Sequence, residues 1–216
     1  MDWSLLSSLP EHERKALIQG ARRRRFDKGE VVFHEGDPGD TLHLLVHGRV
    51  AVRLSTPLGD RTLLRLIGTG GWFGELSLIS PYPRSATIVA LEPTETLVVT
   101  REHTEELRRR IPEFDALMVD ALVREVRRLS LALVDALFVP VDKRLFRRLV
   151  ELSSMYGDGG PGVVIPLTQE ELAQLVGTTR PTANHHLRAA ASAGLIAMRR
   201  GSIEVLDPDG LSRRAG

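Results

Sequence analysis

The sequence predicts an α+β fold: an N-terminal antiparallel β jelly-roll barrel with flanking helices, then a long helix, then a C-terminal winged helix-turn-helix. Three patterns indicate this arrangement. Short β-branched segments alternate with Gly- and Pro-containing turns over residues 30–100, as in antiparallel sandwiches and jelly rolls. A helical repeat of apolar residues follows over residues 113–139. Two short helical patterns separated by a glycine, and then a hairpin pattern, complete the chain.

Two short helices and a run of arginines precede the predicted barrel. The helices are expected over residues 3–9 and 11–21, with Pro10 in a first-turn position of the second, where its missing N–H removes no hydrogen bond. Residues 22–25 are four consecutive arginines. We expect this run to be solvated at the start of the first strand, because no aromatic or glycine-rich stretch accompanies it.

The barrel is predicted from β-branched and aromatic segments bounded by turn residues. The expected strands are residues 31–33, 41–46, 50–55, 62–67, 86–91 and 96–100, with turns at 35–39, 47–48, 57–60 and 68–71. Three histidines, His34, His43 and His47, lie in this region. In one strand His43 and His47 would be about 13 Å apart, too far to share a metal ion. We therefore expect solvent-facing histidines and no metal site.

Residues 70–87 place two charges, Glu75 and Arg84, in a glycine-rich and largely apolar stretch. The guanidinium of Arg84, the hydroxyl of Ser85 and the backbone amides near Gly74 suit a phosphate. Glu75 can only accept hydrogen bonds, and sugar hydroxyls donate them, so the pattern predicts a ribose-phosphate pocket. In the alternative, Glu75 and Arg84 form an ion pair without a ligand. A short buried turn is expected at the apolar residues Phe73, Leu76, Leu78 and Ile79.

A helix is predicted over residues 101–110, and Pro112 interrupts it before the long helix. Along the long helix, apolar residues repeat at alternating spacings of four and three, which is the seam of a two-stranded coiled coil. These residues are Leu122, Val126, Leu129, Leu133 and Ala136. We expect a symmetric dimer through this seam, with core packing inside one chain as the alternative. Pro140 ends the helix, so the predicted domains are residues 1–112, 113–139 and 140–216.

The C-terminal part predicts a helix over residues 142–156 and then a helix-turn-helix. Thr168 and Glu171 have the spacing of a capping box. Gly177 ends the first helix, and Thr179 caps the second. The apolar residues expected to be buried are Leu145, Phe146, Leu149, Leu152, Leu172, Ala173, Leu175, Val176, Ala183, Leu187 and Leu195.

The second of these two helices carries polar and basic side chains away from its apolar stripe. They are Arg180, Thr182, Asn184, His185 and Arg188. Such groups contact base edges and phosphates in DNA complexes. Residues 195–205 then predict a β-hairpin wing with Arg199 and Arg200 near its tip. The combination predicts DNA binding, and a helix-turn-helix that serves only as a packing unit is the alternative.

Composition excludes several classes of function. The chain has no cysteine, which removes disulfides, thiolate metal sites and cysteine nucleophiles. No apolar run approaches the length of a membrane span, and no secretory signal pattern is present, so we expect a cytoplasmic protein without membrane association. The net charge is only +1. No nucleophile–base set or metal cluster emerges, so we do not predict an enzyme.

Together these motifs resemble the CRP/FNR family of bacterial transcription regulators over nearly the full chain. The resemblance rests on residues 48–52, 73–76, 84–87 and 168–188 and on the long helix. It implies a cyclic nucleotide effector, with cyclic AMP expected first and cyclic GMP as the alternative. The implied ligand-binding residues are Phe73, Gly74, Glu75, Leu76, Arg84, Ser85, Ala86, Leu129 and Ser130. The last two match family positions that meet the base, and a leucine replaces one polar group there.

For the DNA-binding half, the resemblance implies contacts from Thr168, Gln169, Thr178, Thr179, Arg180, Thr182, His185, Arg188, Arg199 and Arg200. It also implies a homodimer on a palindromic operator, with RNA polymerase as a further partner. Two alternatives stay open. One is a regulator that binds DNA without nucleotide, its pocket closed by a pair between Glu75 and Arg84. The other is a nucleotide-binding regulatory subunit that acts on a partner protein.

Overall fold

The computed structural model describes the chain except residues 1–2, 7–8, 57–58, 60, 80–81 and 112. Most of the predicted turn at 57–60, and the predicted interruption at Pro112, therefore lie outside the described residues. The chain divides into two compact units, Met1–Arg128 and Leu129–Gly216, and each is described by itself. Within the described residues, no helix is both long enough and apolar enough to cross a membrane.

The first unit contains two four-stranded antiparallel sheets, as the predicted jelly roll requires. One has the order β1 (Arg22–Phe26), β8 (Thr94–Thr100), β3 (Thr41–His47) and β6 (Trp72–Phe73). The other has the order β2 (Val31–Phe33), β7 (Thr87–Ala90), β4 (Arg49–Ser55) and β5 (Arg61–Gly68). One apolar cluster draws on both sheets, and it includes Leu45, Val50, Ile67, Phe73 and Ile88. The fold class and the six predicted strands are confirmed.

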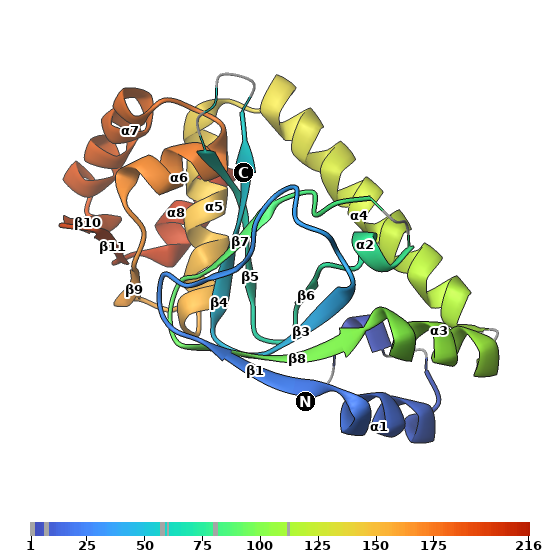
Figure 1. Ribbon diagram of the computed structural model, residues 1–216. Helices are drawn as coiled ribbons and strands as arrows, with labels where there is room; N and C mark the ends of the chain where they lie inside the picture. The colour runs from blue at the N-terminus through green and yellow to red at the C-terminus, as the bar shows by residue number, and fades with distance from the viewer. Residues whose placement is uncertain (1–2, 7–8, 57–58, 60, 80–81, 112) are drawn as a thin grey trace. The chain divides into compact units, whose positions relative to one another are not determined.

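A second apolar cluster joins helices to the β1–β8–β3–β6 sheet. It includes residues of the 3₁₀ helix Ser4–Leu6 and of α1 (Glu11–Gly20), α2 (Leu76–Ile79), α3 (Arg101–Arg110) and α4 (Glu113–Phe138). In Figure 1, α1 and α3 lie near one another at the same end of this sheet.

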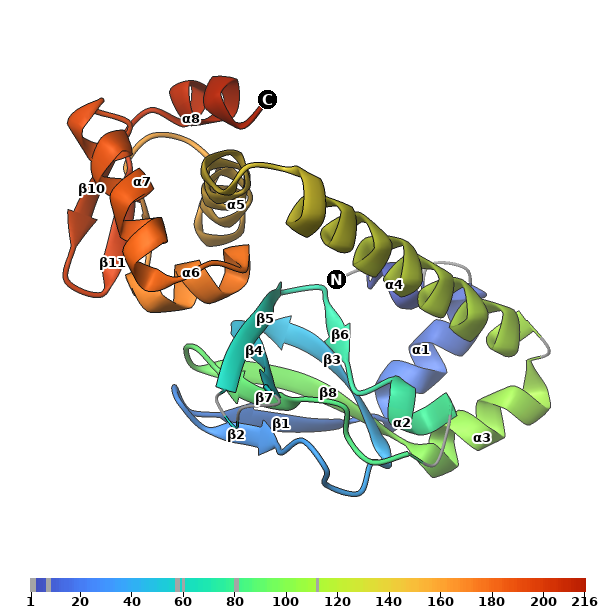
Figure 2. The same cartoon turned by 90° about the horizontal axis from the view of Figure 1, so that it is seen from above.

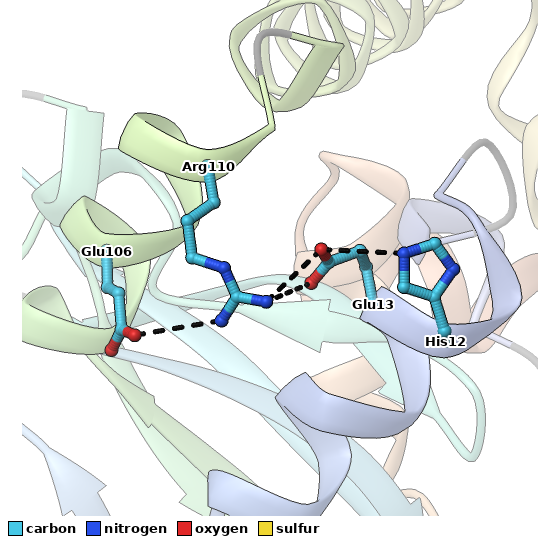
Figure 3. Close-up of polar contacts among 4 residues, drawn as sticks. All are labelled: His12, Glu13, Glu106 and Arg110. Atoms are coloured by element: carbon cyan, nitrogen blue, oxygen red, sulfur yellow. Dashed lines mark hydrogen bonds and ion pairs between the residues drawn. The ribbon is translucent and has the colours of Figure 1, made fainter.

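A charged contact links α1 to α3. Glu13 is a buried carboxylate of α1, and Nη2 of Arg110 donates to its two oxygens at 3.3 and 3.4 Å. Figure 3 shows the guanidinium of Arg110 between Glu13 and Glu106, with His12 on the far side of Glu13. The ion pair to Glu106 spans 3.7 Å. The cation therefore compensates the charge of a buried carboxylate, which His12 also contacts at 3.6 Å.

Three N-terminal predictions need correction. The predicted helix over 3–9 is a 3₁₀ helix at Ser4–Leu6 in the described residues. Pro10 occupies the N-cap of α1, not its first turn. The arginines at 22–25 are themselves strand β1, paired with β8, where Glu95 contacts both Arg23 and Arg25. The four arginines are exposed, so the sequence has no alternation of apolar and polar residues that would predict a strand here. The register of β1 is set by its pairing with β8.

The histidine and turn predictions are also partly wrong. His34 and His47 are exposed, but His43 is buried inside the barrel. The expected buried turn after Phe73 is the short helix α2, in which Leu78 is buried while Leu76 and Ile79 are exposed. A helix turns its residues around its axis, so consecutive apolar side chains cannot all face the core.

The second unit is a winged helix-turn-helix. Its elements are the end of α4, α5 (Val141–Tyr156), β9 (Val163–Ile165), α6 (Gln169–Val176), α7 (Arg180–Ser192), β10 (Ile196–Arg199), β11 (Ser202–Val205) and α8 (Pro208–Ala215). The strands form an antiparallel sheet in the order β10, β11, β9. Figure 2 shows α7 beside the hairpin of β10 and β11. The helix α8 was not predicted.

Local chemistry explains why the helix-turn-helix forms where it does. Thr168 accepts from the backbone N–H of Glu171, and the Glu171 side chain accepts from the Thr168 N–H, so the predicted capping box is present. Gly177 ends α6 in the left-handed conformation at φ 69°, which favours glycine. Thr179 caps α7. All apolar residues of this unit that were predicted to be buried are buried.

Candidate ligand pocket and nucleic-acid interface

Arg84 precedes strand β7 and is held by the loop between β2 and β3. Its backbone N–H donates to the carbonyl of Asp37 at 2.9 Å, and its carbonyl accepts from the N–H of Gly36 at 2.9 Å. These two bonds fix the arginine backbone against a turn that is far from it in sequence. The local chain therefore places the side chain over the barrel interior, where it is 5% exposed.

The guanidinium of Arg84 is held by uncharged groups. Nη1 donates to the carbonyls of Thr41 at 2.8 Å and Gly74 at 3.1 Å. Nη2 donates to Oγ1 of Thr41 at 2.6 Å. Its carbon Cζ lies 4.0 Å from the ring centroid of Phe33, a favourable cation–π distance. These contacts fix the orientation of the Arg84 guanidinium without neutralising its positive charge.

Two features of the Arg84 side chain bear on the predicted phosphate site. Its Nε atom is buried and has no hydrogen-bond partner in the described part of the chain. Burial lowers the pKa of Arg84, while the carboxylates of Asp40, Asp37 and Glu75 act in the opposite direction. A buried guanidinium with an unused donor is suited to an oxyanion, which accepts several charge-assisted hydrogen bonds.

Gly74 makes room for this arginine. The residue has φ +88°, and a Cβ atom there would lie 2.7 Å from both Nη1 of Arg84 and the carbonyl of Thr41. Any larger residue would therefore displace the guanidinium or the strand. The sequence predicted a close backbone approach at Gly74, and the structure adds that the approaching group is the side chain of Arg84.

Glu75 is half-buried at the start of α2. Burial raises the pKa of Glu75, and the nearby Glu125 raises it further, while a backbone hydrogen bond, Arg65 and Arg84 act to lower it. No ion pair joins Glu75 to Arg84 among the residues described, so the pair that the nucleotide-free alternative requires is not formed. Glu75 and Arg84 are therefore not paired directly with each other.

Arg65 and Glu125 connect the barrel to α4 near this carboxylate. Nη1 of Arg65 on β5 contacts Oε2 of Glu125 on α4 at 3.1 Å. Arg128, one turn further along α4, contacts the same carboxylate through two nitrogens at 2.9 and 2.7 Å. These cations hold the pKa of Glu125 below its usual range. The sequence analysis did not identify this cluster.

The other predicted pocket residues have mixed surroundings. Phe73 and Ala86 are buried, whereas Ser85 and Leu76 are exposed. Leu129 and Ser130 are exposed residues of α4 that belong to the second unit. The structure therefore brings the phosphate and ribose residues of the prediction into one region of the barrel.

Arg101 supports the pocket from outside and was missed by sequence reasoning. It begins α3, and its guanidinium donates to the carbonyls of Gly39 at 3.1 Å, Leu78 at 3.4 Å and Ser77. It thereby caps the C-terminal end of α2 and ties it to the β2–β3 loop. Nothing in the sequence around Arg101 distinguishes it from an ordinary exposed arginine at the start of a helix.

The second unit has a cleft of about 400 Å³ between the start of α6, the start of α7 and the wing. Five predicted DNA-binding residues line it: Thr168, Gln169, Arg180, Arg199 and Arg200. Glu170 contributes one carboxylate to the same cleft. Residues from three sequence regions are therefore gathered into one basic surface.

The remaining predicted DNA-binding residues lie outside this cleft. They are Thr178, Thr179, Thr182, His185 and Arg188. The hydroxyls of Thr179 and Thr182 contact each other at 2.9 Å, so part of their hydrogen-bonding capacity is used at the helix start. His185 and Arg188 are exposed on α7.

Two polar side chains of this unit bond within the protein. Asn184, expected to face outward, is half-buried, and its side-chain amide donates to Oε1 of Gln169. Nε of Arg199 donates to Glu204 at 3.0 Å across the hairpin. Within the described residues, Arg180 and Arg200 are the exposed arginines of the cleft that make no such contact with a carboxylate.

The sequence matches two known domain families. Residues 23–110 match the cyclic nucleotide-binding domain, and residues 143–214 match the Crp-like helix-turn-helix domain. The chain is 34% identical over 203 residues to the CRP-like cAMP-activated global transcriptional regulator of Mycobacterium tuberculosis, covering 93% of this chain and 91% of that protein.

Two matches from Thermus thermophilus also span most of the chain. The cyclic AMP receptor protein of this organism is 32% identical over 201 residues, which cover 93% of this chain and 91% of the relative. The crystal structure of the Thermus thermophilus catabolite activator protein is 32% identical, with a TM-score of 0.57 and coverage of 98% and 97% of the two chains.

We predict that Glu75→Gln raises the melting temperature of the ligand-free protein at neutral pH. Because burial raises the pKa of Glu75, the folded state binds this proton more tightly than the unfolded chain does. The wild type therefore loses stability as the pH rises from the ordinary value of 4.5 through the folded-state pKa. The advantage of the variant should vanish at acidic pH, which thermal melts across the pH range measure.

Glu95→Gln is the control with the opposite sign. Hydrogen bonds from Arg25, with Arg23 nearby, lower the pKa of Glu95, so its ionised form is favoured in the folded state. This variant should melt at a lower temperature than the wild type at neutral pH and approach it as the pH falls. A Glu75→Gln protein that is less stable than the wild type at neutral pH would contradict the prediction.

Proposed function

The chain belongs to the CRP/FNR family of transcription regulators, and from this premise we propose that it is a homodimer whose sequence-specific DNA binding is gated by a cyclic nucleotide. In this proposal the nucleotide binds in the barrel, the second unit reads a palindromic operator, and α4 joins two copies. The protein is a DNA-binding regulator and not an enzyme.

The state of Arg84 is the observation that carries the ligand proposal. Its charge is buried, its two Nη atoms are held by Thr41 and Gly74, and its Nε donor is unused within the described residues. A cyclic phosphate would supply the negative charge that this environment lacks. Glu75 would accept from the ribose, since a carboxylate is an acceptor for sugar hydroxyls.

We take cyclic AMP as the first candidate effector because relatives that span most of this chain are named as cAMP-activated or as cyclic AMP receptors. Cyclic GMP is the alternative. Leu129 and Ser130 would meet the base, as the matching family positions do. With a leucine at one of these positions, the base would receive fewer hydrogen bonds, and discrimination between purines would rest on the remaining contacts.

We predict that Arg84→Leu weakens cyclic nucleotide binding by about a hundredfold or more, because a buried charged hydrogen-bonding group is lost from the phosphate. Titration calorimetry with cyclic AMP and cyclic GMP measures this affinity. Arg22→Leu, at an exposed arginine of β1, is the control and should bind as the wild type does. Unchanged affinity of Arg84→Leu would reject the pocket.

The DNA-binding proposal is supported by the cleft of the second unit. Arg180 stands at the first turn of α7, exposed and lining the cleft with Arg200 of the wing. An arginine can make two parallel hydrogen bonds to a guanine, whereas a wing arginine is suited to a phosphate. We therefore assign base reading to Arg180 and contact with DNA phosphates to Arg199 and Arg200. Glu204 would compete with a phosphate for Arg199.

We predict that Arg180→Ala removes sequence preference, with a loss of about 1–3 kcal/mol of discrimination at the base that it reads. The measurement is a gel shift on a site selected from random DNA by the wild type. Arg213→Ala, an exposed arginine on α8, serves as the control of equal charge change. Retention of the selected preference by Arg180→Ala would exclude it as the base reader.

The dimer proposal is supported by the surface of α4. Several of its large apolar residues are exposed in the single chain, and Leu133 has 59% of its surface accessible. The predicted seam residues Val126, Leu129 and Leu133 are among them. A monomeric protein rarely exposes such a continuous apolar surface, and a second α4 would cover it. Two-fold symmetry would then set the recognition helices about 34 Å apart on DNA.

We predict that Leu133→Glu converts the dimer into a monomer, because it places two carboxylates opposite each other in an apolar seam. Sedimentation equilibrium measures the association state. Arg127→Glu, at an exposed position of the same helix outside the predicted seam, is the matched control and should stay dimeric. A dimeric Leu133→Glu protein would argue against this seam.

The two alternatives give different outcomes in these experiments. A regulator that acts without nucleotide would bind DNA equally with and without cyclic AMP and cyclic GMP. A regulatory subunit that controls a partner protein would select no sequence from random DNA. The helix-turn-helix match favours the DNA-binding proposal, and contact with RNA polymerase belongs to it as a further expectation.

A further inference from the structure

His43 is a buried imidazole that the proposed function does not use. It lies on β3 and is 2% exposed. Its neighbour across the sheet is Phe73 of β6, and the two rings stack at a centroid distance of 4.9 Å with an interplanar angle of 11°. A buried histidine beside a binding pocket can fill space in the core, or it can orient neighbouring side chains through hydrogen bonds. The hydrogen bonds of His43 distinguish these two roles.

Both imidazole nitrogens face threonine hydroxyls. Nδ1 lies 3.2 Å from Oγ1 of Thr96, and Nε2 lies 3.4 Å from Oγ1 of Thr41. The second hydroxyl is the same one that accepts from Nη2 of Arg84 at 2.6 Å. His43 is therefore one hydroxyl away from the guanidinium that we assign to the ligand phosphate.

The distribution of protons along this chain follows from donor and acceptor chemistry. Arg84 can only donate, so the Thr41 oxygen accepts from it, and the Thr41 hydroxyl proton is left to donate elsewhere. Nε2 of His43 is the acceptor within reach. The neutral imidazole then carries its proton on Nδ1 and donates it to Thr96. In this arrangement, each of these donor protons has one acceptor.

Protonated His43 would break this arrangement. An imidazolium has no acceptor, so Arg84 and His43 would both have to donate to the Thr41 hydroxyl. Burial, then the positive charge of Arg84 and then that of Arg24 on β1, together lower the pKa of His43 to about 3. The imidazole is thus the neutral acceptor that the Thr41 hydroxyl requires.

His43 also supports the other arm that holds Arg84. Phe73, against which its ring stacks, directly precedes Gly74, and the carbonyl of Gly74 accepts from Nη1 of Arg84. One side chain therefore contacts both the Thr41 hydroxyl and the residue before Gly74. A leucine or phenylalanine could fill the same space, but neither could accept the hydroxyl proton.

We propose that His43 is a positioning residue that orients Arg84 for an anionic ligand by accepting the Thr41 hydroxyl proton and backing the Phe73–Gly74 segment. This role rests on the proposed cyclic nucleotide pocket. Because the Thr41 hydroxyl donates its proton to His43, a lone pair of its oxygen is directed at Nη2 of Arg84. Loss of either partner leaves Nη2 of Arg84 without an oriented acceptor before the phosphate binds, while Nη1 stays on its two carbonyls.

The test combines His43→Phe and Thr41→Val, singly and together, with cyclic AMP titration calorimetry. Each single variant should weaken binding by about tenfold, near the upper end of the range for loss of one neutral hydrogen bond. The double variant should be no weaker than Thr41→Val alone, because both changes break the same chain. Thr41→Ser keeps the hydroxyl and should restore affinity.

Val99→Ala is the control for loss of stability alone. Val99 is buried on β8 in the core between the sheet and the helices, and this variant should melt at a lower temperature but bind as the wild type does. Wild-type affinity in His43→Phe, or independent effects that add in the double variant, would overturn the proposal.

Nitrogen NMR of the wild type provides a readout that needs no ligand and no substitution. The Nδ1–H tautomer of His43 is expected, and an Nε2–H tautomer would overturn the proposal. The Arg84 Nη2 signal should shift in Thr41→Val, because this substitution removes its hydroxyl acceptor while Nη1 keeps its two carbonyls. If the wild type binds neither cyclic nucleotide, the proposed effector fails, while these NMR results still decide the role of His43.

Discussion

The barrel depends on burying one cation without neutralising it. Arg84 is enclosed by carbonyls, a hydroxyl and the face of Phe33, and hydrogen bonds from its two Nη atoms offset part of the cost of burying the charge. Gly74 lacks a side chain because the guanidinium occupies that space. Arg101 holds α2 and the β2–β3 loop together around it. In the proposed function, the anionic ligand would supply the negative charge that Arg84 lacks.

Sequence reasoning succeeded where local chemistry decides structure. The capping box at Thr168, the left-handed Gly177 and the strand segments of the barrel depend on neighbouring residues, so their patterns could be read directly. It also identified Glu75 and Arg84 as charges that require explanation. The fold was thus largely predictable, and the site residues stay a prediction.

The failures concern contacts between distant segments. Nothing in the sequence near Thr41 indicates that its carbonyl and hydroxyl hold an arginine 43 positions away. His43 was expected to face solvent because a histidine in a strand has no preferred side, and only the pairing with Phe73 buries it. Strand β1 was missed because its register is set by β8 and not by its own alternation.

The position of β1 has a consequence for the protein in a crowded cell. This strand is at the edge of its sheet, and an edge presents unpaired backbone groups that could template a strand of another molecule. Its first four residues are exposed arginines. If the β1 strands of two molecules paired, their arginines would be brought together, and the repulsion between these positive charges opposes such pairing. The arginine run thus protects the barrel from aggregation through its own edge.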